Sequence, residues 1–487
     1  MNDSLVPHRY LRMSFVGMVF IATMIFFLTV HPITIISGDD WNGLSISRSG
    51  LPEWKGFNPI KVVPETLMPY AGLFASYVIM PLGISYLFSI AIVTAILVAL
   101  MLAVFFNELF LLLERKLGIG GGKVLMACLI YFIYLFGLFK THSDNNSAYL
   151  LWEINLTCYY HYVLPALMNG ALVLHLMRSD VSGAALSKRS PAVVGMLVLA
   201  AYLCIFSSIF HSIFLAVFSG VSLLISLYRD RTKGLSSGSF HLFIVILWLV
   251  SALFEMNGGR ATEIGGQHLK VLESISLFWD FAKDSNHLYR SLLVCTLVLG
   301  AATFVRRSAS ECENRARGLF CVALLACVLS FAGLMLICAK ASSGYAARPV
   351  AMWGIYMYLM VAASVALACA LERYRTLNYI LPLLIFVLFN KAVTPGTSFK
   401  EPYNLNIPYS KAAAVTNDMI RQVQNAERNG QKDMVLEVPQ SEGDNWPFPI
   451  YMGPVVSETL RADGLIERSI NITIHPNSDM NRLYGIP

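Results

Sequence analysis

Repeated long apolar runs constrain this chain more than any other feature. Several exceed the roughly 18 apolar residues that are needed to cross a bilayer as a helix. Only 14% of the 487 residues are charged, whereas about a quarter are charged in soluble domains. We therefore expect an all-α polytopic membrane protein. We predict eleven transmembrane helices, at 13–36, 86–113, 124–140, 163–178, 191–208, 211–228, 238–255, 288–305, 318–339, 351–371 and 377–392.

Two apolar stretches do not read as single transmembrane helices. The run at 191–228 is too long for one helix, so we place a tight re-entry at residues 207–212. The stretch at 61–81 is apolar, but three prolines interrupt it, which favours a helix lying in the membrane interface. The first run, at 13–36, lacks a small-x-small cleavage site and is expected to remain as a signal anchor.

The distribution of lysine and arginine predicts the orientation. These residues are more numerous in the loops that share a side with the N-terminus, which favours a cytoplasmic N-terminus and a periplasmic C-terminus in a bacterial inner membrane. The net charge is +6, but the basic residues are dispersed among loops. Dispersed charge of this kind is not typical of a nucleic-acid-binding protein.

The chain changes in composition after about residue 392. We predict a transmembrane body at 1–392 and a small periplasmic α+β domain at 393–487. The sequence DMVLEVP at 433–439 is typical of a strand. Before it, a helix that Gly430 can end is predicted to place five apolar residues on one face: Ala412, Val415, Met419, Val423 and Ala426.

Two adjacent aspartates directly follow the first apolar run. A 24-residue helix spans about 36 Å, so Asp39 and Asp40 are expected to emerge at the membrane surface. There, a carboxylate can act as general base on a sugar hydroxyl, and mutual repulsion can raise the pKa of one of the pair. The alternative is a helix end with two solvated acids and Trp41 as an interfacial aromatic residue.

Four cations on the predicted outer side are candidates for binding a lipid phosphate. Arg260 follows Gly258 and Gly259, which allow close approach of the backbone to a ligand. Lys340 and Arg348 flank a short loop and can clamp a phosphate leaving group. Lys270 is a weaker candidate. The alternative is that these are ordinary interfacial cations.

Aromatic and polar residues on the predicted outer side are candidates for holding a sugar. Aromatic faces beside hydrogen-bonding groups suit a sugar ring, although an aromatic belt at the membrane interface is the alternative. No spacing of His, Asp or Glu has the quality of a metal site, so we predict neither a metal nor a cofactor. The candidates for sugar or acceptor binding are Trp41, His142, Trp152, Glu153, Tyr159, His161, His211 and Trp446.

These features together resemble a known class of membrane enzymes. A signal anchor followed at once by GDDW, an interface-lying first loop and about ten further spans resemble the GT-C glycosyltransferases. The NGGR segment at 257–260 and the pair Arg348-Pro349 are similar to arginine motifs in bacterial members. The length and the short C-terminal domain most resemble the phage-encoded, serotype-converting O-antigen glucosyltransferases.

The resemblance implies a specific reaction. Such an enzyme transfers glucose, with inversion, from undecaprenyl phosphate glucose to the O-antigen repeat unit of lipopolysaccharide at the periplasmic face. It implies Asp40 or Asp39 as the base, and Arg260, Arg348 and Lys340 as the groups that stabilise the departing phosphate. A flippase and a synthase of the lipid-linked glucose are implied as functional partners.

Other classes of membrane protein remain open at this stage. A lipid-linked oligosaccharide flippase would be expected to carry internal repeats and cations at mid-membrane depth. An O-antigen polymerase would be expected to carry a large outer loop between late spans. A solute transporter is a third alternative, with the same expectation of repeats. The sequence displays none of these features, which favours the transferase.

Overall fold

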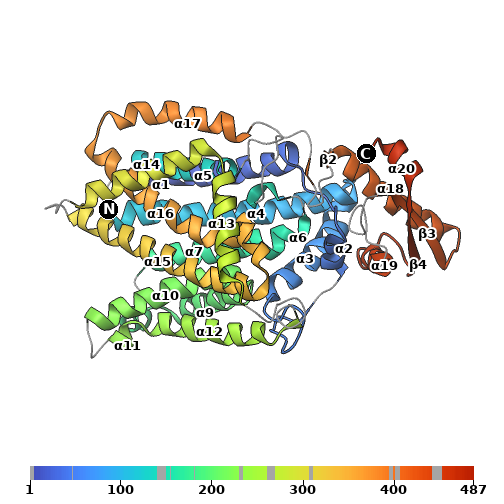
Figure 1. Ribbon diagram of the computed structural model, residues 1–487, viewed down its shortest axis with the longest axis horizontal. Helices are drawn as coiled ribbons and strands as arrows, with labels where there is room; N and C mark the ends of the chain where they lie inside the picture. Colours follow the sequence, from blue (N-terminus) through green and yellow to red (C-terminus); the bar gives the residue numbers. More distant parts are fainter. Residues whose placement is uncertain are drawn as a thin grey trace.

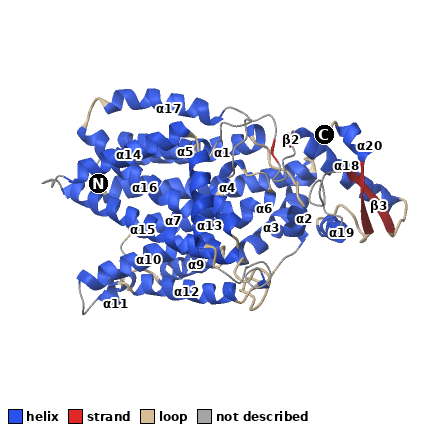
Figure 2. Cartoon of the chain, viewed as in Figure 1, coloured by secondary structure: helices blue, strands red, loops and turns tan. Residues whose placement is uncertain are grey.

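The computed structural model describes twelve segments of the chain, and helices dominate them. The long helices run side by side in one body, and a small C-terminal domain lies at one end of it (Figure 1). The strands gather at that same end (Figure 2), which we call the domain-facing end. The described residues are 5–45, 48–139, 150–153, 155–179, 181–229, 234–259, 269–305, 311–393, 399–400, 406–407, 409–440 and 452–486.

Every predicted transmembrane segment contains a helix in the structure, but in the first, 13–36, the helix ends at Val30 and residues 31–36 are not helical. Eight helices in the described segments are long and apolar enough to cross a membrane, and seven of them match predicted spans. The other four predicted spans contain helices of 15 to 17 residues, α5, α7, α9 and α17. The helices are α1 (Leu5–Ile25, continued by η1, Phe26–Val30), α4 (Tyr86–Leu111, continued by η4, Leu112–Lys116), α5 (Gly121–Gly137), α7 (Leu164–Arg178), α9 (Pro191–Ile205), α10 (Ile209–Arg229), α12 (Ser239–Met256), α14 (His287–Val305), α15 (Glu311–Ala341), α16 (Pro349–Arg373) and α17 (Leu377–Val393).

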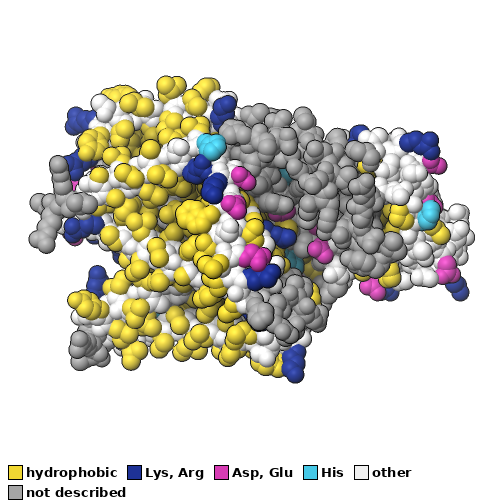
Figure 3. Space-filling model, in the orientation of Figure 1, with side chains coloured by type: hydrophobic (Ala, Val, Ile, Leu, Met, Phe, Trp, Pro, Cys, Tyr) yellow, Lys and Arg dark blue, Asp and Glu magenta, His cyan; other side chains and the backbone are white. Residues whose placement is uncertain are grey.

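Helix α16 forms the centre of the body, and close packing surrounds it. A Cβ atom on Gly354 of α16 would lie 2.4 Å from the Phe214 ring of α10. A Cβ on Gly170 of α7 would lie 2.8 Å from Phe105 of α4. Glycine at these two positions therefore lets neighbouring helices pack closely. Hydrophobic side chains cover much of the visible face of the body, and charged side chains lie at its end away from the C-terminal domain and in a band beside the residues drawn in grey (Figure 3).

The two ambiguous apolar stretches fold differently. The run at 191–228 breaks as predicted, since α9 ends at Ile205 and α10 begins at Ile209. The stretch after Lys61 forms a nearly continuous helix, α3 (Val62–Phe74), extended by η2 (Ala75–Ile79) and η3 (Met80–Leu82). This helix is long and apolar enough to cross a membrane. Its location in the interface therefore stays a prediction.

Helix α13 (Val271–Asp284) was not predicted. It runs across the long helices rather than along them (Figure 1). Ser274, Phe278 and Phe281 are buried and share one face at helical spacing, and the Phe278 ring lies 5.2 Å from that of Phe331 on α15. The helix is amphipathic, which marks a surface helix packed on the body.

The C-terminal domain contains the predicted helix and strand. All five predicted apolar residues of α18 (Tyr409–Arg428) are buried, and Gly430 takes a left-handed φ of 70° beyond its end. Strand β3 (Asp433–Pro439) pairs in parallel with β4 (Asn471–Asn477), which was not predicted. Helix α19 (Gly453–Ala462) connects these strands, and α20 (Ser478–Tyr484) follows. A short antiparallel pair, β1 (Phe399–Lys400) with β2 (Asn406–Ile407), comes before α18 at the start of this region.

Candidate functional site

The two adjacent aspartates have opposite environments. Both lie in the first turn of the short helix α2 (Gly38–Ser45), at the domain-facing end. Successive residues of a helix point about 100° apart, so the pair cannot share one environment. The side chain of Asp39 is exposed, whereas Asp40 is fully buried.

Both carboxylate oxygens of Asp40 accept hydrogen bonds within the fold. Oδ2 accepts from the backbone N–H groups of Ile36, at 2.9 Å, and Ser37, at 3.1 Å. Oδ1 accepts from the backbone N–H and the hydroxyl of Thr157, at 2.7 and 2.8 Å. Burial raises the pKa of Asp40, while these hydrogen bonds oppose the rise. Asp40 therefore ties α2 to α6 (Leu156–Cys158), and Asp39 is the carboxylate left open to a substrate.

The C-terminal domain holds the other side of the segment that carries Asp39. The Thr416 hydroxyl of α18 donates to the Ile35 carbonyl, and the Thr459 hydroxyl of α19 donates to the Trp41 carbonyl, each at 3.0 Å. The Trp41 side chain is fully buried. Its ring is therefore part of the core and does not face solvent where a sugar would bind.

A buried lysine forms a second polar centre close by. Lys61, at the N-cap of α3, is 6% exposed, and its Nζ lies 3.0 Å from Nδ1 of His161. An ammonium group only donates, so Nδ1 of His161 accepts and its hydrogen resides on Nε2. The Nζ atom also lies 5.8 Å from the Tyr162 ring centroid. A cation held in this way at the domain-facing end is suited to an anion.

Aromatic rings connect Lys61 to Arg348. The ring centroids of Tyr162 and Phe210 are 6.5 Å apart, and those of Phe210 and Tyr345 are 4.8 Å apart. The Arg348 guanidinium lies 5.1 Å from the Tyr345 ring centroid, within cation–π range. We call Lys61, Tyr162, Phe210, Tyr345 and Arg348 the cation–aromatic row.

The pKa of the Cys158 thiol responds to charges of both this row and the aspartates. Burial raises the pKa of Cys158, and the nearby charges of Glu153, Asp40 and Asp39 raise it further, whereas that of Arg348 lowers it. These charges therefore lie within electrostatic range of one thiol. Thr157, the residue before this thiol, binds Asp40, and Asp40 is the chain neighbour of the exposed Asp39.

Two predicted sugar-binding residues, Trp152 and Tyr159, instead brace the fold with their side chains. The Trp152 indole N–H donates to the Phe136 carbonyl at 2.7 Å. The Tyr159 hydroxyl contacts the carbonyls of Leu151 and Glu153, at 3.1 and 2.7 Å. Both rings are buried, as is Glu153. Their contacts hold the segment that carries Thr157 in place, so these residues position the site and do not contact a substrate.

His211 joins two central helices beside the row. Its Nε2 donates to the Val350 carbonyl at 2.7 Å, which links the start of α10 to the start of α16. Among the described residues its Nδ1 has no hydrogen-bond partner. The imidazole lies 6.1 Å from the Tyr162 ring and within electrostatic range of Lys61. His211 therefore borders the cation–aromatic row.

The other predicted cations are either exposed residues at the ends of α13 and α15 or lie outside the described residues. Lys270 forms an ion pair with Glu273 at 3.2 Å, and Glu273 accepts from Ser343 at 2.5 Å. The hydrogen bond from Ser343 to Glu273 fastens α13 to the loop before α16. Lys340 is exposed at the end of α15. Three predicted residues lie outside the described segments, Arg260, His142 and Trp446.

Sequence reasoning missed Lys61 and Thr157. Lys61 is a single cation between apolar residues, in a stretch that is otherwise uncharged from residue 56 to 64. A cation of this kind signals function when it is buried, but its partner lies 100 residues away. Within the described segments, no group of three or more His, Cys, Asp or Glu residues is arranged to hold a metal ion.

Comparison with protein-family models, curated proteins and solved structures finds no match to this chain. The structure itself shows a helical, multi-pass membrane body with a small C-terminal domain. A function can therefore be proposed only from the chemistry of the site and from the motifs in the sequence.

Proposed function

We propose that this chain is a GT-C-like inverting glycosyltransferase that uses a polyprenyl phosphate sugar. The sugar donor is undecaprenyl phosphate glucose, and the acceptor is the O-antigen repeat unit of lipopolysaccharide at the periplasmic face. The observation that carries the proposal is that one short segment, residues 157–162, contacts the helix of the exposed Asp39, through Thr157 and Asp40, and also the cation Lys61, through His161.

The proposed reaction assigns a role to each of these groups. Asp39 takes the proton of the acceptor hydroxyl, whose oxygen attacks the anomeric carbon from the face opposite the phosphate. The bond between that carbon and the phosphate oxygen breaks, and its electron pair leaves with the phosphate. Arg348 and Lys61 stabilise the developing charge, which is often the largest catalytic contribution. A phosphate leaving group needs no second acid, unlike the leaving group in glycoside hydrolysis.

The buried neighbours have positioning roles in this proposal. Asp40 and Thr157 fix α2 from the body side, while Thr416 and Thr459 fix it from the C-terminal domain. Such bracing holds a base in place, and small displacements of reacting groups cost large factors in rate. Of the aromatic members of the row, Tyr345 is half-buried and offers a ring face to the sugar, whereas Tyr162 and Phe210 are buried and support Lys61 and Tyr345.

A transfer assay with purified protein tests the proposal. The full chain in lipid nanodiscs is given synthetic polyprenyl phosphate glucose and an O-antigen oligosaccharide, and products are analysed by mass and by linkage. We expect one added hexose and stoichiometric release of polyprenyl phosphate, and no transfer from a nucleotide-linked glucose. Transbilayer movement of the lipid without release of polyprenyl phosphate would instead indicate a flippase. Joining of repeat units would indicate a polymerase.

A further inference from the structure

A groove opens between four helices on the side of the body away from α10 and α12. Residues of α5, α14, α16 and α17 line a space of about 190 Å³. Helix α17 contributes one stripe, Leu377, Leu381, Leu384 and Leu388, at the spacing of a single helix face. Among the polar lining residues, the Thr296 hydroxyl donates to the Leu292 carbonyl of its own helix at 2.7 Å. The groove is therefore apolar in character along most of its length.

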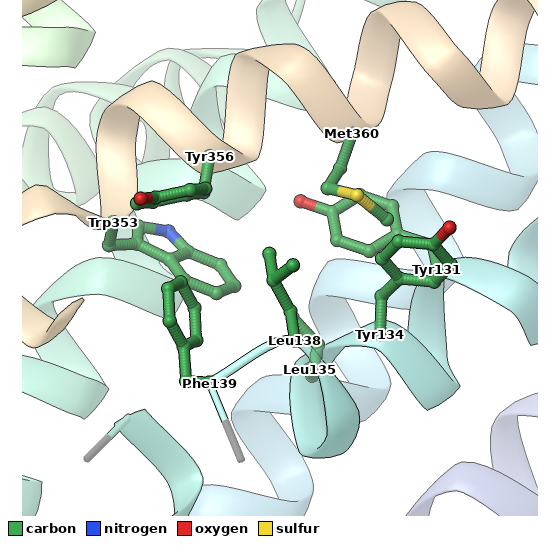
Figure 4. A pocket seen from close by; sticks show the side chains of 8 residues that line it. All are labelled: Tyr131, Tyr134, Leu135, Leu138, Phe139, Trp353, Tyr356 and Met360. Atoms are coloured by element: carbon green, nitrogen blue, oxygen red, sulfur yellow. The ribbon is translucent and has the colours of Figure 1, made fainter. Parts of the chain in front are cut away.

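A second, narrower hollow continues the groove toward the domain-facing end. Tyr134 and Met360 line both spaces. Figure 4 shows the rings of Trp353 and Tyr356, from α16, beside Phe139 on one side of this hollow, with Met360 and the two tyrosines Tyr131 and Tyr134 on the other. It holds about 10 Å³, close to the space of one water. Met360, at the junction of the two spaces, is of a residue type that adapts readily to its surroundings.

Helix α16 extends from the cation–aromatic row to the groove. Arg348 precedes the first residue of α16, and Met360 lies twelve residues further on, a distance of about 18 Å along the axis. Trp353 and Tyr356 lie between them on the wall of the narrow hollow. One helix therefore leads from an apolar groove to Arg348, a cation at its N-terminal end.

A ligand that fits both the apolar groove and Arg348 is an amphiphile with a phosphate head and a branched apolar tail. An engineered apolar cavity of about 150 Å³ holds a benzene molecule, so a groove of 190 Å³ has room for a short branched hydrocarbon segment. We infer that the groove between α5, α14, α16 and α17 binds the prenyl tail of the lipid phosphate whose head lies at Arg348. This inference rests on the proposed function.

Photocrosslinking of the full chain in nanodiscs tests the tail site. The probe is a polyprenyl phosphate that carries a diazirine within its tail, and crosslinked peptides are mapped by mass spectrometry. We expect crosslinks in the segments 292–299 of α14 and 360–367 of α16. Unlabelled polyprenyl phosphate should compete with the probe, and phosphatidylglycerol at the same concentration should not.

Two adjacent leucines of α17 provide a matched pair of variants. Leu384 lines the groove, whereas Leu383 is 67% exposed on the outside of the same helix. Leu384→Trp should lower crosslinking about tenfold, the loss expected when two buried methylene groups are displaced. Leu383→Trp should leave it unchanged.

Three results would overturn the tail site. These are crosslinks confined to other helices, equal competition by phosphatidylglycerol, or equal effects of the two tryptophan variants. Turnover of polyprenyl phosphate glucose by the same preparation separates this inference from the proposed function. Transfer without crosslinks in the groove contradicts the tail site alone. Crosslinks in the groove without transfer contradict the transferase and leave the tail site supported.

Discussion

The domain-facing end and the flank formed by α14 and α17 are held together in different ways. At the domain-facing end, side chains far apart in sequence meet in directed hydrogen bonds, such as Asp40 with Thr157 and Lys61 with His161. On the flank, the described residues meet mainly through apolar contacts, with one long-range hydrogen bond from Tyr289 to the Leu388 carbonyl at 2.6 Å. Hydrogen bonds fix direction, whereas apolar burial is non-directional. The first region is therefore suited to positioning a reacting head group, and the second to accepting an apolar chain.

The largest expected loss of stability comes from removing the Asp40 carboxylate. In Asp40→Asn, one oxygen is replaced by an amino group that faces buried donors, so at least one of them loses its acceptor. We expect a cost of about 3 kcal/mol in the free energy of unfolding. Thermal unfolding in detergent measures it, with the adjacent Asp39→Asn as the control. Equal midpoints for the two variants would show that Asp40 does not hold the fold.

Docking of the C-terminal domain on the body should depend on pH through Asp463. The Tyr86 hydroxyl donates to its carboxylate, and burial raises the pKa of Asp463 from 3.8 to about 6. Because the docked pKa is the higher one, docking is most stable below about pH 4 and weakens as pH rises through about 6. The change is at most about 3 kcal/mol.

Hydrogen exchange of α19 at pH 5 and pH 7.5, corrected for the intrinsic rates, measures this change. Protection should be greater at pH 5. In Asp463→Asn, which cannot ionise, the corrected protection should be the same at both values. Wild-type protection that does not vary with pH would contradict the assignment.

Removing the buried charge of Lys61 should weaken binding of the donor more than it affects the fold. Lys61→Gln keeps a donor but loses the charge, and hydrogen bonds to charged groups contribute about 1.5–3 kcal/mol. We expect KM for polyprenyl phosphate glucose to rise about ten- to a hundredfold. Lys270→Gln is the control, because Lys270 already pairs with Glu273. Similar KM values for the two variants would remove Lys61 from the phosphate site.

The smallest expected effect concerns one contact of the C-terminal domain with the segment before α2. Thr416→Val keeps the shape of the side chain and removes the hydrogen bond to the Ile35 carbonyl, at a cost of about 1 kcal/mol. Hydrogen exchange of residues 33–41 should increase in this variant. Thr473→Val, at an exposed position of β4 in the same domain, should leave exchange in that segment unchanged. An unchanged rate in both would show that the contact does not restrain α2.

The elements predicted correctly are those whose signal is local. Apolar runs and the residues that end them located the long helices, the break between Ile205 and Ile209, and the buried face of α18. Parallel pairing of β3 with β4 joins residues 38 apart, such as Asp433 with Asn471, and no local pattern encodes it. The amphipathic helix α13 was missed because its apolar positions are spaced rather than continuous.

The candidate site was predicted only in part, because some of its contacts join residues that are far apart in the sequence. The motif GDDW correctly marked an exposed position for Asp39, but the sequence did not distinguish Asp39 from the buried Asp40. Only the fold distinguishes the two, because Thr157 comes from a segment 117 residues away. Arg348 was named from its loop, whereas Lys61 was not, since its role depends on burial against His161.

The measurement that tests the account most directly is transfer from polyprenyl phosphate glucose by Asp39→Asn and Asp40→Asn, each purified and compared at equal folded concentration. If Asp39 is the base, Asp39→Asn should keep the wild-type unfolding midpoint and lose about 10²- to 10⁴-fold in rate. Asp40→Asn should unfold at a lower temperature and keep a larger share of its activity per folded molecule. A well-folded Asp39→Asn that transfers glucose at the wild-type rate would contradict the assignment of Asp39 as the catalytic base.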